Sequence, residues 1–202
     1  MSRKIMIVEG EDETSFFRTF CNKKQLPEFE YISVGGKSKI KSRLALLIND
    51  PDSDEIETII VVQDADASHA NTLQSLKATF RNAGLPVPDD HLTFANDTEK
   101  GLKVGCYVMP GDGSEGMLED LLLQSVSDSP VKEEAENYIG KLLEIADTGA
   151  IEAPKNLPKA KLHAYLSGLK KHQKNIGLAT AASCFNLDSA ALEPLRAFLA
   201  SA

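Results

Sequence analysis

The sequence predicts an α/β fold, in which a mainly parallel sheet of about four strands has flanking helices and is followed by a helical C-terminal extension. Short β-branched runs alternate with amphipathic stretches over residues 1–127, the pattern of repeated β-α-β units. Strand patterns then stop, and only helical patterns follow. The chain has 202 residues, 42% of them hydrophobic, which is enough for a continuous core. We therefore expect an α/β core at 1–127 and a helical extension docked on it at 128–202.

The expected strands are short runs that are either continuously apolar or alternating. Residues 4–8 are apolar and end at Glu9-Gly10, as a buried parallel strand does. Residues 56–62 form the most β-branched run of the chain. The strands expected in order are 4–8, 29–34, 56–62 and 104–109, with a short additional one before the last at 91–94.

The expected helices carry apolar side chains at spacings of three and four residues. Residues 14–24 place three phenylalanines on one face, and 71–82 are followed by Gly84 at a typical C-cap position. The core helices expected in order are 14–24, 37–49, 71–82 and 117–126, and those of the extension are 131–146, 159–171, 176–185 and 189–200. In the extension, Leu162, Tyr165, Leu166 and Leu169 share one face, which we expect to be buried against the core.

Charge and composition narrow the classes of function. The net charge is −8, and residues 1–149 hold 15 Lys/Arg against 27 Asp/Glu, whereas residues 150–202 hold 7 against 3. An acidic body is a poor non-specific nucleic-acid binder, but it suits a carboxylate cluster that holds cations. No run approaches 18 apolar residues and the N-terminus leads directly into a strand, so neither a membrane span nor a signal peptide is expected. Three widely spaced cysteines without a CxxC pattern indicate reduced thiols and a cytoplasmic protein.

Carboxylates follow several of the expected strands. Glu9 follows the first strand, Asp64 and Asp66 follow the third, and Asp112 and Glu119 come after the last. Ligands in open α/β sheets bind at the carboxyl ends of the strands, and residues two apart in extended chain point to the same side. Because like charges this close repel unless a cation lies between them, and because all donors are oxygens, the pattern favours Mg²⁺ or Mn²⁺.

These residues resemble a known domain. Glu9-Gly10-x-x-Glu13, followed by Asp64-Ala65-Asp66, is similar to the Toprim domain of topoisomerases, bacterial-type primases and several nucleases, and the similarity covers about residues 4–127. The segment around Glu119 resembles the further glutamate of the overcoming-lysogenisation-defect nucleases. The chain as a whole is most similar to small stand-alone bacterial Toprim-like proteins. The family position four residues after the glutamate is often Asp; here it is Glu13 with Asp12 beside it, and both remain candidates to face the metal.

The resemblance implies a Mg²⁺- or Mn²⁺-dependent, nuclease-like protein that cleaves phosphodiester bonds in DNA or RNA. Glu9, Asp64 and Asp66 would be catalytic and metal-binding, and Glu119 would be a further metal ligand. Lys37 and Lys39, after the second strand, would contact substrate phosphate. No tyrosine nucleophile of a topoisomerase and no ATPase motif is recognisable. The alternative is a non-catalytic Toprim-like module that binds metal or nucleic acid and acts with a partner protein or as a homo-oligomer.

Other motifs have simpler explanations. Gly111–Gly116 matches GxGxxG, but a Rossmann unit needs a following strand where residues 131–146 predict a helix. Asp50–Asp54 resembles the start of a calcium loop that lacks the required Gly and Glu at positions 6 and 12. His69 is close enough in sequence to Asp66 to donate a proton, although a polar residue at a helix start is the commoner role.

Overall fold

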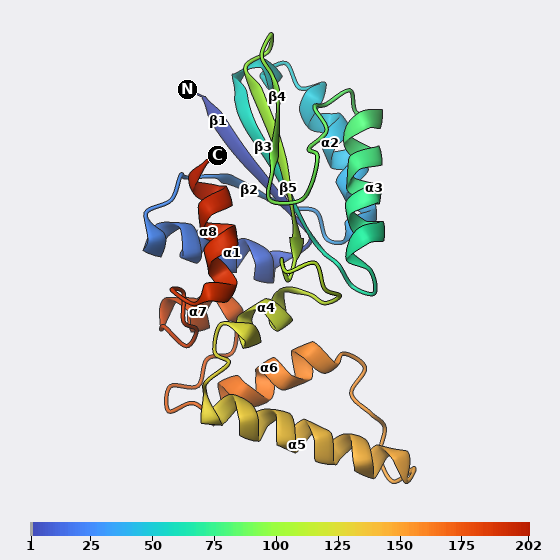
Figure 1. Ribbon diagram of the computed structural model, residues 1–202, viewed down its shortest axis with the longest axis vertical. Coiled ribbons are helices and arrows are strands. Elements are labelled where there is room, and N and C mark those ends of the chain that lie inside the picture. The colour runs from blue at the N-terminus through green and yellow to red at the C-terminus, as the bar shows by residue number, and fades with distance from the viewer. Residues whose placement is uncertain (1) are drawn as a thin grey trace.

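The computed structural model describes residues 2–202 and confirms the predicted fold class (Figure 1). Within these residues five strands form one sheet in the order β2-β1-β3-β5-β4, in which only β4 is antiparallel to its neighbour. The strands are β1 (Arg3–Val8), β2 (Glu30–Ser33), β3 (Ile56–Asp64), β4 (Phe94–Asp97) and β5 (Leu102–Met109). The helices are α1 (Glu11–Lys24), α2 (Ile40–Ile48), α3 (His69–Asn82), α4 (Leu118–Gln124), α5 (Pro130–Asp147), α6 (Leu157–Gly168), α7 (Ile176–Ala181) and α8 (Glu193–Ala200), with 3₁₀ turns η1 (Lys37–Lys39), η2 (Ser53–Glu55) and η3 (Ala190–Leu192).

The sheet differs from the prediction at β4. A short strand was expected at 91–94, and the structure places it at Phe94–Asp97, where it pairs antiparallel with β5. Leu92 has φ 59°, so the chain turns there instead of extending. The sequence Phe-Ala-Asn-Asp shows no apolar alternation. Most residues of this edge strand are only half-buried, and the strand is defined by its antiparallel pairing with β5.

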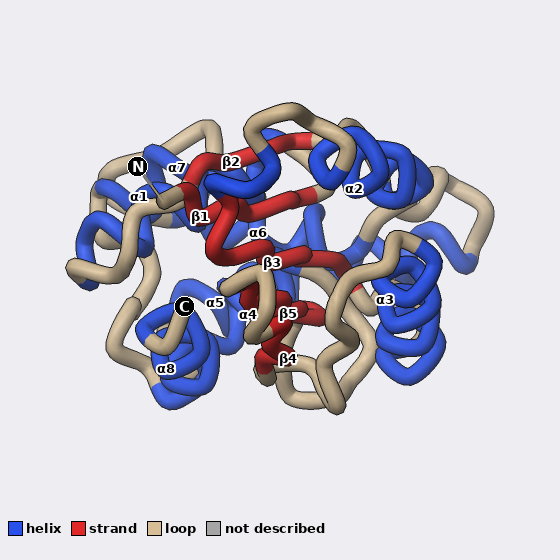
Figure 2. Tube along the Cα trace, turned by 90° about the horizontal axis from the view of Figure 1, so that it is seen from above, coloured by secondary structure: helices blue, strands red, loops and turns tan. Residues whose placement is uncertain are grey.

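Helices cover both faces of the sheet. Figure 2 shows α1, α7 and α8 on one side and α2 and α3 on the other. The alternation of β1 divides the core accordingly: Met6 and Val8 pack with the α1 phenylalanines, and Ile5 and Ile7 pack with α2 and α3. Gly105 in β5 leaves room for Phe94 and Phe198, whose rings stack with centroids 4.5 Å apart.

The C-terminal helices contact the α/β core at several points. Figure 1 shows α5 and α6 beyond α4, at the carboxyl end of the sheet, while α8 packs through Phe198 against Phe94 of β4 and beside Gly105 of β5. Leu162, Tyr165 and Leu166 are buried in the same apolar cluster as the α1 phenylalanines, and Leu169 is partly buried against it.

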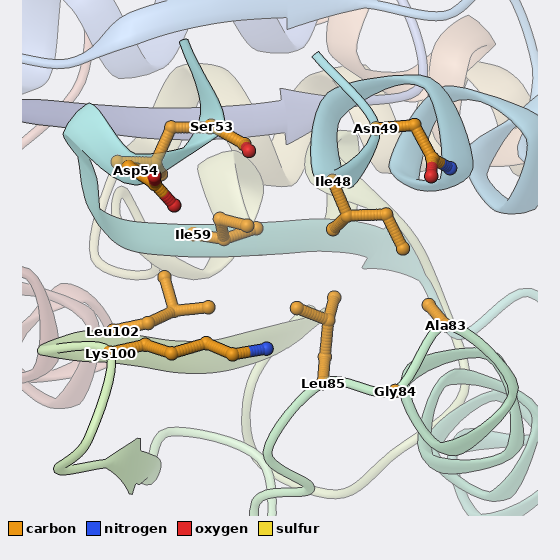
Figure 3. A pocket seen from close by; sticks show the side chains of 11 residues that line it. Ile48, Asn49, Ser53, Asp54, Ile59, Ala83, Gly84, Leu85, Lys100 and Leu102 are labelled. Carbon is orange, nitrogen blue, oxygen red and sulfur yellow. The ribbon is translucent and has the colours of Figure 1, made fainter. Parts of the chain in front are cut away.

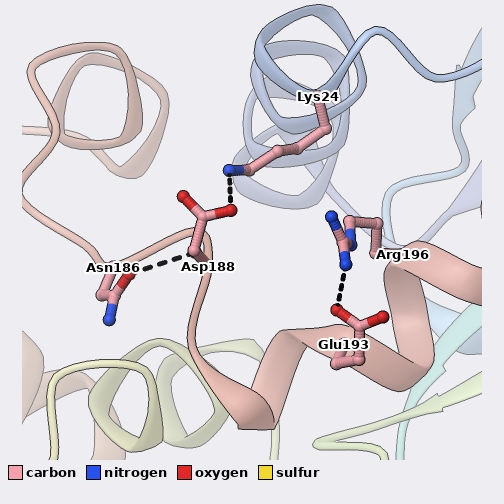
Figure 4. Close-up of polar contacts among 5 residues, drawn as sticks. All are labelled: Lys24, Asn186, Asp188, Glu193 and Arg196. Carbon is pink, nitrogen blue, oxygen red and sulfur yellow. Dashed lines mark hydrogen bonds and ion pairs between the residues drawn. The ribbon is translucent and has the colours of Figure 1, made fainter.

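Polar contacts also connect the C-terminal segment to the core. Lys24 of α1 pairs with Asp188, whereas Arg196 pairs with Glu193 within α8 (Figure 4). Lys4 Nζ donates to the Ala202 carbonyl over 2.8 Å, so the C-terminal end lies beside the first strand. None of the helices in residues 2–202 combines the length and apolar character needed to cross a membrane.

Candidate functional site

The structure brings Glu9 and Asp64 together at the carboxyl edge of the sheet. β1 and β3 are parallel neighbours with Ile7 opposite Val61, so the residues that follow them meet. The Asp64 amide donates to Glu9 Oε1 over 3.2 Å, and the Leu118 amide at the start of α4 donates to Asp64 Oδ1 over 3.1 Å. These two hydrogen bonds join the end of β1, the end of β3 and the start of α4.

Asp66 is held by its backbone. It has φ 50°, and its amide and carbonyl exchange two 2.9 Å hydrogen bonds with Gly116. Gly116 itself has φ 136°, and a Cβ there would lie 2.7 Å from Asp120 Oδ2, so glycine is needed. The loop that follows β3 and the loop that precedes α4 are therefore fixed to each other, which places Glu119 close enough for its charge to act on Asp64.

The carboxylates of this cluster are difficult to ionise together. Burial, followed by the charges of Glu9, Glu13 and Glu119, raises the pKa of Asp64 to about 8. Burial also raises the pKa of Glu9, with contributions from Asp66 and Glu13. The pKa of Glu119, which is only 5% exposed, is raised mainly by burial. At neutral pH and without a cation, burial and the neighbouring charges therefore favour the protonated form of Asp64.

Glu13 is the acidic residue of α1 that acts on the cluster. Its charge raises the pKa of Asp64, Glu9 and Glu119, whereas that of Asp12 raises only the pKa of Glu119 among these three. The first turn of α1 carries both residues because acidic side chains are favoured at a helix N-terminus. The charge of Glu13 therefore acts on more of the clustered carboxylates than that of Asp12, where the sequence left both residues open.

Two lysines border the acidic cluster. Lys37 forms an ion pair with Asp66, and Lys159 Nζ lies 3.7 Å from Glu119 Oε1. Lys37 was expected to contact substrate, and here it neutralises a predicted metal ligand. Lys39 lies apart from the cluster, in a groove beside β2. Lys159 could not be predicted from the sequence, because only the packing of α6 against α4 brings it to Glu119.

The carboxylates do not form a ready-made metal centre. Over residues 2–202, no group of three or more His, Cys, Asp or Glu side chains is arranged so that it could hold a metal ion. Their chemistry still fits a divalent cation, because all donors are carboxylate oxygens and the charges of three further carboxylates raise the pKa of the half-buried Asp64. The cation would have to compete with the Asp64 proton and with Lys37 on Asp66.

The remaining predicted residues lie elsewhere. His69 begins α3 with its ring 4.5 Å from that of His91, and Asp112 accepts hydrogen bonds from Ser114 and Gln124. A pocket of about 340 Å³ lies at the opposite, amino edge of the sheet between α2 and α3 (Figure 3). Its apolar floor includes Ile59 and Leu102, and it contains none of the clustered carboxylates.

Comparison with known families places the chain. The sequence profile of the family described as "Protein of unknown function (DUF3226)" matches residues 3–202. The chain belongs to this family. No curated protein matches it.

Two solved structures of the C-terminal region of the Xanthomonas campestris pv. campestris OLD protein are similar to this DUF3226 chain. The one phased with iodine gives a TM-score of 0.52 at 16% identity, covering 100% of this chain and 95% of that one. The one phased with platinum gives 0.50 at 14% identity, covering 99% and 93%. At these identities the similarity shows the fold alone, and it agrees with the α/β architecture predicted from the sequence.

Proposed function

We propose that this chain is a Mg²⁺- or Mn²⁺-dependent phosphodiesterase of the Toprim type that acts on nucleic acid. The observation that carries the proposal is the cluster of Glu9, Glu13, Asp64 and Glu119 at adjoining strand ends, in which the pKa of Asp64 is raised to about 8. Clustered carboxylates with strongly raised pKa values are typical of functional sites. The fold similarity to the OLD C-terminal region supports the same class.

Glu9, Asp64, Asp66 and Glu119 are the residues that would hold the cation. Once bound, it would supply Lewis-acid neutralisation of the phosphodiester charge. Asp64 has to release its proton for this, and Glu9 holds the backbone of Asp64 in place through its 3.2 Å hydrogen bond. Binding therefore becomes tighter as pH rises towards 8.

The two bordering lysines would bind the phosphate. Lys37 pairs with Asp66 in the absence of substrate, and it can exchange that carboxylate for a phosphate oxygen once a cation occupies Asp66. The side chain of Lys159 is 52% exposed, and its ammonium group, next to Glu119, offers a second positive charge for the phosphate. Together they supply the positive charge that the acidic body lacks.

The experiment is a cleavage assay with the purified chain. Supercoiled plasmid, single-stranded DNA and RNA are incubated with Mn²⁺, Mg²⁺ or EDTA, and we expect metal-dependent products with at least one substrate. Asp64→Asn keeps the shape of the side chain and its acceptor for Leu118, and should abolish cleavage. Asp147→Asn, at the exposed end of α5, is the matched control and should cleave as wild type.

A non-catalytic module is the second candidate, favoured by the lack of a three-ligand metal group in residues 2–202 and by the Lys37–Asp66 ion pair. Calorimetric measurement of Mn²⁺ binding, combined with the cleavage assay, distinguishes the phosphodiesterase from the non-catalytic module. Binding of Mn²⁺ that depends on Asp64, without cleavage of any of the three substrates, would contradict the phosphodiesterase and support the module.

A further inference from the structure

The outer edge of β2 is an open strand edge. Figure 2 shows β2 at one side of the sheet, and in residues 2–202 its one strand neighbour is β1. The amides of Val34 and Gly36 donate to the Val8 and Glu9 carbonyls, so alternate residues of this segment turn their main chain towards β1. The amides and carbonyls of Tyr31 and Ser33 therefore face outward.

A groove of about 570 Å³ runs along this edge. One wall is a stripe of α2 and the turn before it, formed by Lys39, Ser42, Arg43 and Leu46 at helical spacing. Glu11, at the start of α1, also lines the groove, and Glu30 lies on the same face of β2 as Ile32, where it is paired with Arg3 over 2.8 Å. The groove thus has a basic and apolar stripe along α2, beside which Glu30 is neutralised by Arg3, and the acidic Glu11 at its other side.

Two side chains in the α2 wall lack a partner in the part of the chain that the structure describes: one is an exposed apolar group, and the other contains a buried hydrogen-bond donor. The Leu46 side chain is 64% exposed, although it lies beside a strand edge. Arg43 Nε is buried and has no hydrogen-bond partner among residues 2–202. A buried donor without a partner is costly, so a rotation of the Arg43 side chain that offers its guanidinium to a carboxylate of a bound segment would be favoured.

We propose that an extended acidic peptide of a partner protein binds in this groove as an added strand beside β2. Its main chain would pair with the outward groups of Tyr31 and Ser33, a carboxylate would reach Arg43, and an apolar side chain would cover Leu46. Alternate residues of a strand point to opposite faces, so such a peptide places its carboxylates on the α2 side only. This inference is independent of the proposed function.

Other occupants fit less well. A nucleic-acid strand would bring its phosphates close to Glu11 and Glu30 as well as to Arg43. A second copy of the chain, paired through β2 about a two-fold axis, would place the two basic α2 stripes on the same face of the joined sheet, where they repel. A peptide avoids both conflicts.

The test uses a fluorescein-labelled octapeptide that alternates glutamate with valine, with a lysine–valine octapeptide as the charge control. Fluorescence anisotropy should show binding of the first only. Arg43→Glu should weaken binding at least tenfold, about 1.4 kcal/mol. Lys41→Glu, an exposed residue of α2 outside the groove, is the matched control and should bind as wild type.

A backbone variant tests strand addition itself. Ser33→Pro removes an outward amide without removing a bond to β1, and should also weaken binding tenfold, while circular dichroism checks that the variant folds. Asp64→Asn should leave binding unchanged. No binding of the acidic peptide would overturn the inference, as would equal losses in Arg43→Glu and Lys41→Glu. Displacement of the peptide by oligo-dT, or dimerisation that Ser33→Pro prevents, would assign the groove to nucleic acid or to a second copy instead.

Discussion

Replacing Asp64 by asparagine should stabilise the protein at high pH. The protonated carboxyl is favoured in the folded state, so between pH 3.8 and about 8 the folded protein binds more protons than the unfolded chain. The contribution of Asp64 to the free energy of unfolding therefore falls as pH rises through this window, and the full penalty is present above pH 8. Asparagine cannot ionise, and it keeps the acceptor for the Leu118 amide.

The size of the effect follows from the pKa shift. A rise from 3.8 to about 8, at about 1.4 kcal/mol per unit, sets an upper bound of about 6 kcal/mol. Water that reaches the half-buried carboxyl and relaxation of the neighbouring side chains screen much of this. We expect Asp64→Asn to raise the free energy of unfolding by about 1–3 kcal/mol at pH 9, and the gain to shrink towards pH 4.

The assay is urea unfolding followed by circular dichroism, at intervals from pH 4 to 9 in EDTA. The quantity compared is the difference between variant and wild type at each pH, because this removes the other titrating groups that both share. Asp147→Asn should show no pH-dependent difference. A difference between Asp64→Asn and wild type that stays constant with pH, or that becomes destabilising at pH 9, would refute the reasoning from the carboxylate cluster.

Three further outcomes are expected. Millimolar Mn²⁺ or Mg²⁺ should raise the melting temperature in thermal melts, since a cation at one hundred times its dissociation constant adds about 2.7 kcal/mol to the free energy of unfolding. The double variant Asp64→Asn with Asp66→Asn should abolish this rise. Phe17→Ala, at a fully buried position, should lower the free energy of unfolding by about 3–5 kcal/mol in urea titrations. Lys37→Met removes the cation paired with Asp66, so calorimetry should show tighter Mn²⁺ binding, while cleavage of nucleic acid should slow; weaker Mn²⁺ binding would contradict the competition between Lys37 and the metal.

Local pattern was enough to predict most of the core. The strands β1, β3 and β5 contain continuous apolar runs, as strands covered on both faces require, and the helix α1 has apolar residues at a spacing of three and four; their burial follows these patterns. The meeting of Glu9 and Asp64 also followed from sequence, because the carboxyl ends of neighbouring parallel strands share one edge. The edge strand β4 was placed too early because it lacks an apolar pattern of its own.

Tertiary structure decided which charges oppose one another at that edge. Lys159 and Glu119 are 40 positions apart and meet because α6 packs on α4, and Lys37 reaches Asp66 across the turn after β2. The sequence determined by itself that carboxylates would gather there. The protonation of Asp64 and the two ion pairs depend on burial and on side-chain directions, which arise only when distant segments pack together.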